Sequence, residues 1–137
     1  IQAPLILTPH IGEYHRLATS VGIECESAEA LAQAYGCVVV LKSHVTTISD
    51  GVQTECYEQG GVELATGGSG DVLTGIIVGL LAQFGVDCVS HLFDAALLGV
   101  HIHGLAGKSF AMQHGNRGML ATDLLERIPD AMASIQQ

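Results

Sequence analysis

The fold is decided by one stretch of small residues and glycines, Leu64-Ala-Thr-Gly-Gly-Ser-Gly-Asp-Val-Leu-Thr-Gly75. It leads into an apolar run over residues 72–84 that is typical of a buried helix. Glycines let the backbone approach a bulky phosphate, and the free amides at a helix start favour an anion. Asp71, in the first helical turn, is expected to be held as a carboxylate and can then act as a base. The stretch predicts an anion-binding turn, with a plain glycine turn before a buried helix as the alternative.

Two common phosphate loops do not fit this stretch. No Lys-Ser or Lys-Thr pair follows the glycines, which excludes a P-loop. Leu73 stands where the dinucleotide-binding fingerprint requires a third glycine after Gly68 and Gly70. The turn is therefore expected to bind phosphate in another way.

The segments upstream of the turn predict a sheet. Cys37-Val-Val-Val-Leu41 is apolar on both faces, the pattern of a parallel strand covered by helices on both sides. A shorter apolar run, residues 4–8, predicts a second such strand. Asp50-Gly51 lies between residues 46–49 and 53–57 and predicts a hairpin at the sheet edge. Four or five helices are expected, over residues 14–20, 28–35, 72–84, 91–106 and 124–134. Ser27 would cap the second of these helices and Gly36 would end it, and Thr122 or Asp123 would cap the last.

Polar residues follow both parallel strands at their carboxyl ends, where open α/β sheets bind ligands. His10 and Glu13 follow the first strand, and Lys42 follows the second. A turn histidine satisfied by the backbone is the alternative for His10, and an exposed solubilising lysine is the alternative for Lys42. His101 and His103 lie about 200° apart around a helix, so they are not expected to hold one metal ion. One of these two is expected to pack and the other to be exposed.

Composition limits the classes of function. The chain has 137 residues, the length of one domain, and is 48% hydrophobic with 14% charged residues. A net charge of −9 argues against binding nucleic acid, whose backbone requires a basic patch. No run is long enough to span a membrane, and the glycines of Gly75-Ile-Ile-Val-Gly79 are expected to let a helix lie close against a sheet. Because no positively charged, apolar leader is recognised in the sequence, secretion is not expected. The cysteines show no paired spacing, so they are expected to be reduced and mostly buried, which indicates the cytoplasm: Cys25, Cys37, Cys56 and Cys88.

The number of strands is small for the sheet that these residues predict. Two parallel strands and one hairpin leave the apolar strand over residues 37–41 short of neighbours. Residues 1–137 are therefore expected to form a single partial domain, the C-terminal half of a larger α/β domain. Self-association into a homo-oligomer, or a second polypeptide, is expected to cover the open sheet edge.

Several segments, in order along the chain, resemble one known family. They are Leu7-Thr-Pro-His-Ile-Gly-Glu13, Val39-Val-Leu-Lys42 with Thr46, Ala65-Thr-Gly-Gly-Ser-Gly-Asp-Val-Leu-Thr-Gly75, His103-Gly104 and Ala121-Thr-Asp-Leu124. The chain resembles the ADP/ATP-dependent NAD(P)H-hydrate dehydratases of the ribokinase-like superfamily. The resemblance implies a three-layer αβα fold, of which this chain would supply the C-terminal part.

The resemblance also implies a reaction and a site. In the family, a phosphoryl group passes from ADP or ATP to the hydroxyl on the ring of hydrated NADH or NADPH, and phosphate elimination restores the cofactor. Asp71 would be the base and would contact this substrate together with His10, and Mg²⁺ would bridge the phosphates without a ligand set from the protein. The anion hole for the transferring phosphoryl group would be formed by the backbone of Gly67, Gly68, Ser69 and Gly70. The adenine nucleotide would be lined by Lys42, Ser43, His44, Val45, Thr46 and Gly70.

The sequence departs from the family pattern at three places. Ile11 replaces a proline, Ser43 replaces a glycine, and residues 57–61 lack the usual asparagines. Two alternatives to the dehydratase therefore stay open. One is a truncated module without catalysis, which binds nucleotide or associates with itself, and the other is a different ribokinase-like small-molecule kinase.

Overall fold

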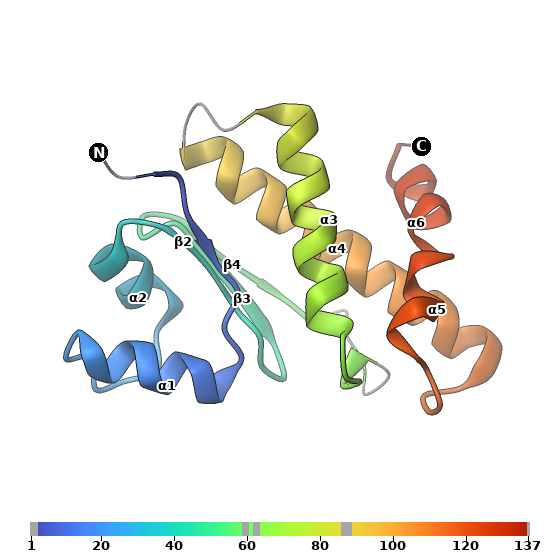
Figure 1. Ribbon diagram of the computed structural model, residues 1–137, viewed down its shortest axis with the longest axis horizontal. Coiled ribbons are helices and arrows are strands. Elements are labelled where there is room, and N and C mark those ends of the chain that lie inside the picture. Colours follow the sequence, from blue (N-terminus) through green and yellow to red (C-terminus); the bar gives the residue numbers. More distant parts are fainter. Residues whose placement is uncertain (1–2, 59–60, 62–63, 86–88, 137) are drawn as a thin grey trace.

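The computed structural model describes residues 3–58, 61, 64–85 and 89–136, and its centre is a four-stranded mixed sheet (Figure 1). The strands lie in the order of the sequence: β1 (Ile6–Leu7), β2 (Val38–Leu41), β3 (Thr46–Ser49) and β4 (Thr54–Tyr57). β1 pairs with β2 in parallel, and the other two pairings are antiparallel. The two parallel strands and the hairpin predicted from the sequence are confirmed.

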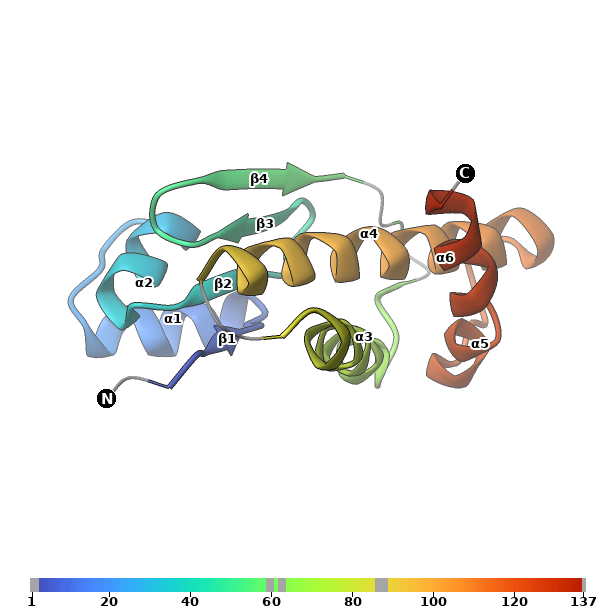
Figure 2. The same ribbon diagram turned by 90° about the horizontal axis from the view of Figure 1, so that it is seen from above.

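Helices cover the sheet on both faces. The helices of the described residues are α1 (Ile11–Ser20), α2 (Ala28–Tyr35), α3 (Ser69–Phe84), α4 (Val89–His114), α5 (Ala121–Leu125) and α6 (Ile128–Ile135), and the last two pack on α3 and α4. Figures 1 and 2 show α1 and α2 on one side of the sheet, and α3 and α4 on the other. The chain therefore has the three-layer αβα arrangement expected from its sequence.

The strand β2 shows why the layers form. Its four side chains are at most 4% exposed, and alternate ones enter different cores. Val38 and Val40 pack with residues of α3 and α4, whereas Val39 and Leu41 pack with residues of α1 and α2. Burial of each such side chain contributes about 1.5–3 kcal/mol, so a strand that is apolar on both faces is stable only between two helical layers.

Two helices begin or end away from the predicted positions because of their glycines. α3 begins at Ser69, directly after Gly68, whose φ of +88° is the left-handed conformation that glycine accepts. α4 was expected to end near residue 106 but continues to His114 and stops at Gly115, with φ of +80°. Gly107 lies inside α4 and does not end it. A Cβ built at Gly107 would lie 2.6 Å from Cδ2 of Leu64, so glycine at this position lets Leu64 pack against the helix.

The prediction for the C-terminal helix was wrong in its continuity and its cap. The segment forms two helices, with Pro129 near the start of α6, because proline lacks the amide that an unbroken helix would need there. Neither predicted residue is itself the N-cap. Asp123 lies three residues inside and its Oδ2 atom accepts a hydrogen bond of 2.8 Å from the amide of Leu120.

The predicted close contact of Gly75 and Gly79 with the sheet was also wrong. A Cβ at either residue would meet nothing within 4 Å. The close approach occurs instead at Gly99 of α4, where a Cβ would lie 2.6 Å from Cγ1 of Ile77 in α3. Gly99 therefore allows the two helices to pack tightly.

The expectation that the cysteines are mostly buried was wrong for the described ones. Cys37 is buried, whereas Cys25 and Cys56 are exposed, and all three are free thiols. Cys88 lies outside the described residues. Within the described ranges, no helix combines the length and apolar character needed to cross a membrane.

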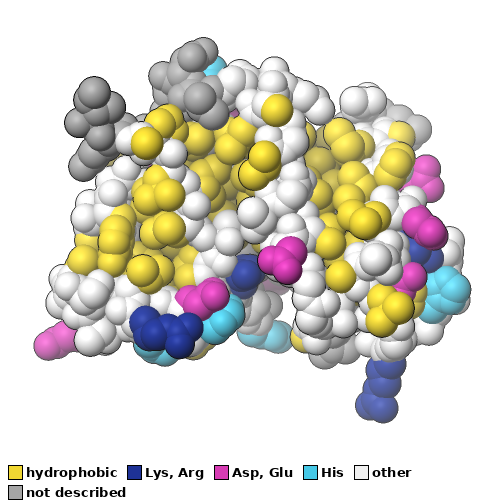
Figure 3. Space-filling model, in the orientation of Figure 1, with side chains coloured by type: hydrophobic (Ala, Val, Ile, Leu, Met, Phe, Trp, Pro, Cys, Tyr) yellow, Lys and Arg dark blue, Asp and Glu magenta, His cyan; other side chains and the backbone are white. Residues whose placement is uncertain are grey.

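One face of the molecule carries much apolar surface. Figure 3 shows apolar side chains gathered on both sides of α3. Val78 of α3 is 59% exposed, and β1 pairs only with β2 among the described residues. Surface of this kind is expected to be covered by other polypeptide.

Candidate active site

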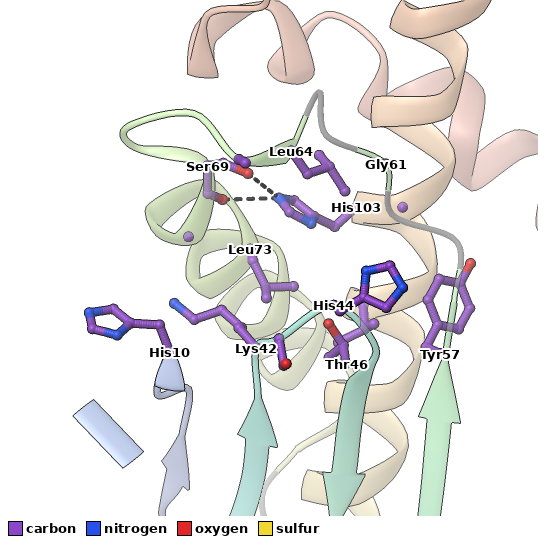
Figure 4. A pocket seen from close by; sticks show the side chains of 15 residues that line it. His10, Lys42, His44, Thr46, Tyr57, Gly61, Leu64, Ser69, Leu73 and His103 are labelled. Atoms are coloured by element: carbon purple, nitrogen blue, oxygen red, sulfur yellow. Dashed lines mark hydrogen bonds between the residues drawn. The ribbon is translucent and has the colours of Figure 1, made fainter. Parts of the chain in front are cut away.

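A cavity of about 600 Å³ lies between the carboxyl ends of the first strands, the start of α3 and the inner face of α4 (Figure 4). Seven of the residues predicted from the sequence line it: His10, Lys42, Ser43, His44, Thr46, Ser69 and Gly70. Four others do not: Val45, Gly67, Gly68 and Asp71. The fold therefore gathers most of the predicted nucleotide-binding residues around one space.

The glycine turn presents amide donors at the start of α3. The amide of Ser69 donates to the carbonyl of Thr66 at 3.2 Å, and the amide of Val72 donates to the carbonyl of Gly68 at 3.1 Å. Between them, the amides of Gly70 and Asp71 have no hydrogen-bond acceptor among the described residues. Two free amides at the positive end of a helix dipole favour an anion.

The turn is held in place from outside. The hydroxyl of Thr66 donates to the carbonyl of Met119 at 3.0 Å, which ties the turn to the segment before α5. A Cβ at Gly68 would lie 3.0 Å from Cβ of Ala121, so the first residue of α5 packs directly on the turn. The amide donors are thus fixed before any ligand arrives, which is the condition for effective electrostatic stabilisation.

Lys42 brings a positive charge to the same point. The amide of Lys42 donates to the carbonyl of Pro9 at 2.8 Å, and a bridge to His10 extends the pairing of β1 and β2. The half-buried side chain reaches α3, where its Nζ atom lies 2.9 Å from the position that a Cβ of Gly70 would occupy. Lys42 is therefore not a freely exposed solubilising lysine. Its ammonium lies against the first turn of α3, and glycine at position 70 makes the room.

His10 has a structural role and also borders the cavity. It is the N-cap of α1: Nδ1 accepts from the amide of Glu13 at 3.2 Å, and Oε2 of Glu13 accepts from the amide of His10 at 2.8 Å. The hydrogen bond from the His10 backbone holds the pKa of the Glu13 carboxyl below its ordinary value. The backbone contact proposed as the alternative for His10 is therefore present, and the imidazole still lines the cavity.

Asp71 lies on a different side of the turn. It is exposed and borders a second cavity of about 510 Å³, which runs along α3 and is lined by Gly75 and Gly79 as well as side chains of α5 and α6. The start of α3 thus separates the space that contains Lys42 from the space that contains the Asp71 carboxyl. Gly70 lines the first of these spaces and Asp71 lines the second.

Several walls of the first cavity were not predicted. Apolar side chains from three elements line it: Leu64, Leu73 and Val100. His103 also lines the cavity. The sequence could have predicted that His103 faces inward, because it lies on the same helical stripe as the buried Ala96 and Val100.

Tyr57 lines the cavity from the end of β4. Its phenol is hydrogen-bonded to the imidazole of His101 on α4, and burial raises the pKa of Tyr57 to about 12. Of the two histidines of α4, His103 packs inside as expected, but His101 is half-buried against Tyr57 rather than exposed.

The donors present fit phosphate better than a metal held by protein alone. Within the described ranges, no three His, Cys, Asp or Glu side chains converge as metal ligands. An ammonium and two free amides suit phosphate oxygens, and Mg²⁺ is commonly held by substrate phosphates and water with few protein ligands. The residues therefore fit a nucleotide that carries its own Mg²⁺.

A family profile described as NAD(P)H-hydrate dehydratase matches residues 1–130. The chain belongs to the NAD(P)H-hydrate dehydratase family. This confirms the membership indicated by the segments around the glycine turn.

Individual relatives agree with the family match. The chain is 44% identical to a bifunctional NAD(P)H-hydrate repair enzyme of Vibrio cholerae over 95% of its own length, which is 26% of that relative. A structure of an ADP/ATP-dependent NAD(P)H-hydrate dehydratase from Bacillus subtilis, co-crystallised with ATP and Mg²⁺, is 32% identical, with a TM-score of 0.80. That match covers 96% of this chain and 48% of the other. A ribokinase-like superfamily protein from Enterococcus faecalis is 32% identical over 94% of this chain and 44% of its own, with a TM-score of 0.77.

These matches fix the fold and the extent of the likeness. The chain has a ribokinase-like fold. It spans about a quarter of the length of the Vibrio relative and about half of the Bacillus structure.

Proposed function

We propose that this chain carries the adenine-nucleotide site and the phosphoryl-transfer turn of an ADP- or ATP-dependent NAD(P)H-hydrate dehydratase. The observation that carries the proposal is the position of the Lys42 ammonium against Gly70, beside the two free amides at the start of α3. An ammonium and fixed amides at one point match a terminal phosphate, since charge-assisted hydrogen bonds are the strong ones.

Each side of the turn has its part in the reaction. The nucleotide would occupy the cavity of Lys42, with its base against the apolar walls and its terminal phosphoryl group on the amides of Gly70 and Asp71. The hydroxyl of the hydrated nicotinamide ring would approach from the side of Asp71, and His10 would contact the substrate from the first cavity. Asp71 would take the proton of that hydroxyl while the hydroxyl oxygen attacks the terminal phosphorus. The nucleotide would then leave with one phosphate fewer. Loss of phosphate from the ring carbon, together with a proton from the neighbouring carbon, would restore the double bond of NADH or NADPH.

The lengths of the relatives shape the proposal. We propose that residues 1–137 form part of one larger domain and that a complementing half is needed for full turnover, because the matches cover only about half of the Bacillus enzyme. A second candidate is a module that binds nucleotide or associates with itself without turnover. The exposed Val78 and the apolar surface beside α3 favour self-association.

The deciding experiment measures the return of NADH absorbance from hydrated NADH with Mg²⁺ and either ADP or ATP. It is run with residues 1–137 alone and with the remainder of the domain supplied. We expect Asp71→Asn to lower turnover by about 10²–10⁴-fold while nucleotide affinity stays close to that of the wild type.

The matched control is Asp130→Asn, which changes another exposed aspartate in the first turn of a helix, α6. Equal turnover by the two variants would refute the role of Asp71. Nucleotide binding without turnover in either arrangement would support the second candidate instead.

A further inference from the structure

His103 is buried directly behind the glycine turn. It is 8% exposed and projects from α4 toward Ser69, the first residue of α3, which is 3% exposed (Figure 4). The Nε2 atom of His103 lies 3.0 Å from the hydroxyl oxygen of Ser69 and 3.0 Å from its carbonyl oxygen. One imidazole nitrogen therefore meets two oxygens of the residue at which α3 begins.

The pair of contacts decides which nitrogen of His103 carries the proton. A carbonyl oxygen can only accept, so Nε2 at 3.0 Å must present an N–H to Ser69. The other tautomer would place a nitrogen lone pair against the carbonyl lone pairs. Burial lowers the pKa of His103, the hydrogen bond to Ser69 raises it and the charge of Lys42 lowers it; the net lowering favours the neutral ring, and the carbonyl contact places its hydrogen on Nε2.

This tautomer determines what the hydroxyl of Ser69 can do. Its oxygen faces the N–H of His103 and accepts, so its own hydrogen is not given to the imidazole. No other partner of this hydroxyl occurs among the described residues. Ser69 lines the same cavity as Gly70 and Lys42, and its hydrogen is available there.

We propose that His103 is a positioning residue, which donates from Nε2 to Ser69 and so turns the Ser69 hydroxyl outward as a further donor to a phosphoryl oxygen. The inference rests on the proposed function, since it requires a phosphate at the turn. It adds a side-chain donor to the backbone amides of Gly70 and Asp71, and it explains why a polar side chain lies on the otherwise apolar stripe of α4.

Three substitutions test the role by binding. Leucine at position 103 fills the space but donates nothing, whereas glutamine carries an amide N–H close to the position of Nε2. We expect His103→Leu to weaken ADP binding about 10- to 100-fold and His103→Gln to recover most of that loss. Ser69→Ala should weaken binding as much as His103→Leu, and the double variant should be no weaker than either. Affinity is measured by calorimetry with Mg²⁺ and ADP, and thermal midpoints report on folding.

The tautomer is tested on the wild-type chain by the ¹⁵N NMR shifts of the His103 ring, with and without ADP. We expect Nε2 to be protonated and Nδ1 bare in both samples. A proton on Nδ1, or ADP binding by His103→Leu equal to that of the wild type, would overturn this inference alone. Failure of the wild type to bind ADP, ATP or inorganic phosphate would overturn the proposed function, and the role of His103 with it.

Discussion

The contact between Lys42 and Gly70 leads to a measurable prediction about nucleotide binding. A Cβ at position 70 would lie 2.9 Å from Nζ of Lys42, closer than the two atoms can approach. Nζ ends a flexible side chain and Gly70 has an ordinary helical backbone, so Gly70→Ala should move the ammonium and leave the fold intact. Loss of one charge-assisted hydrogen bond costs about 1.5–3 kcal/mol, which corresponds to a rise in Kd of roughly 10- to 150-fold.

The assay is isothermal titration calorimetry with ADP or ATP in the presence of Mg²⁺. Gly67→Ala is the matched control, because it adds the same methyl group to the same turn but meets nothing within 4 Å. The control should bind nucleotide nearly as the wild type does. Both variants should keep the thermal midpoint of the wild type or exceed it slightly, since alanine restricts the unfolded chain more than glycine does.

A double-mutant cycle separates displacement of the ammonium from any other effect of the methyl group. Lys42→Met removes the charge, so Gly70→Ala should add little further loss of affinity in that background. The reasoning is refuted if Gly70→Ala binds as tightly as Gly67→Ala, or if its full effect persists without the lysine.

Three further predictions concern stability and association. Gly107→Val should lower the free energy of unfolding by about 1–3 kcal/mol, because even a Cβ at this position would lie 2.6 Å from Leu64. Gly79→Ala places its methyl group in open space and should raise the free energy of unfolding by about 0.5–1 kcal/mol. Equal denaturant midpoints for the two variants would contradict this. The pKa of Glu13 lies below its ordinary value of 4.5 in the folded chain, so its stabilising contribution is present above that value and is lost as pH falls through the lower pKa. The thermal midpoint of the wild type should then fall more steeply on acidification than that of Glu13→Gln, and parallel curves would show that the His10 cap contributes nothing. Residues 1–137 should form dimers or larger oligomers through the β1 edge and the apolar surface beside α3, and a strictly monomeric mass in light scattering would count against this.

Much of the fold followed from local pattern. Four consecutive apolar residues in β2 require cover on both faces, and Asp50-Gly51 favours the tight turn that joins β3 to β4. Helix ends were less predictable. Glycine often ends a helix, but Gly107 lies inside α4, where its lack of a side chain lets Leu64 pack against the helix. Whether a glycine ends a helix or lets a neighbour approach depends on what packs against it.

The candidate site also has a part that the sequence predicted and a part that only the structure shows. Seven predicted residues meet in one cavity because they follow neighbouring strands or begin α3, positions that the sequence marks. Asp71 belongs to the same turn, yet it borders the second cavity, since successive residues of a helical turn point in different directions. Sequence order alone does not show which side of a helix start a carboxyl will face.

The sequence by itself determined that this chain has a glycine turn at the start of a helix, a strand buried on both faces, and membership of one family. Backbone conformation and hydrophobic period decide such features, and both are local. Only the tertiary structure decided that the ammonium of Lys42 lies against Gly70 and that His103 lies behind Ser69. These contacts join residues far apart in the chain, and they exist because α3 packs against α4 and its first turn faces the strand ends, at distances that only close packing fixes.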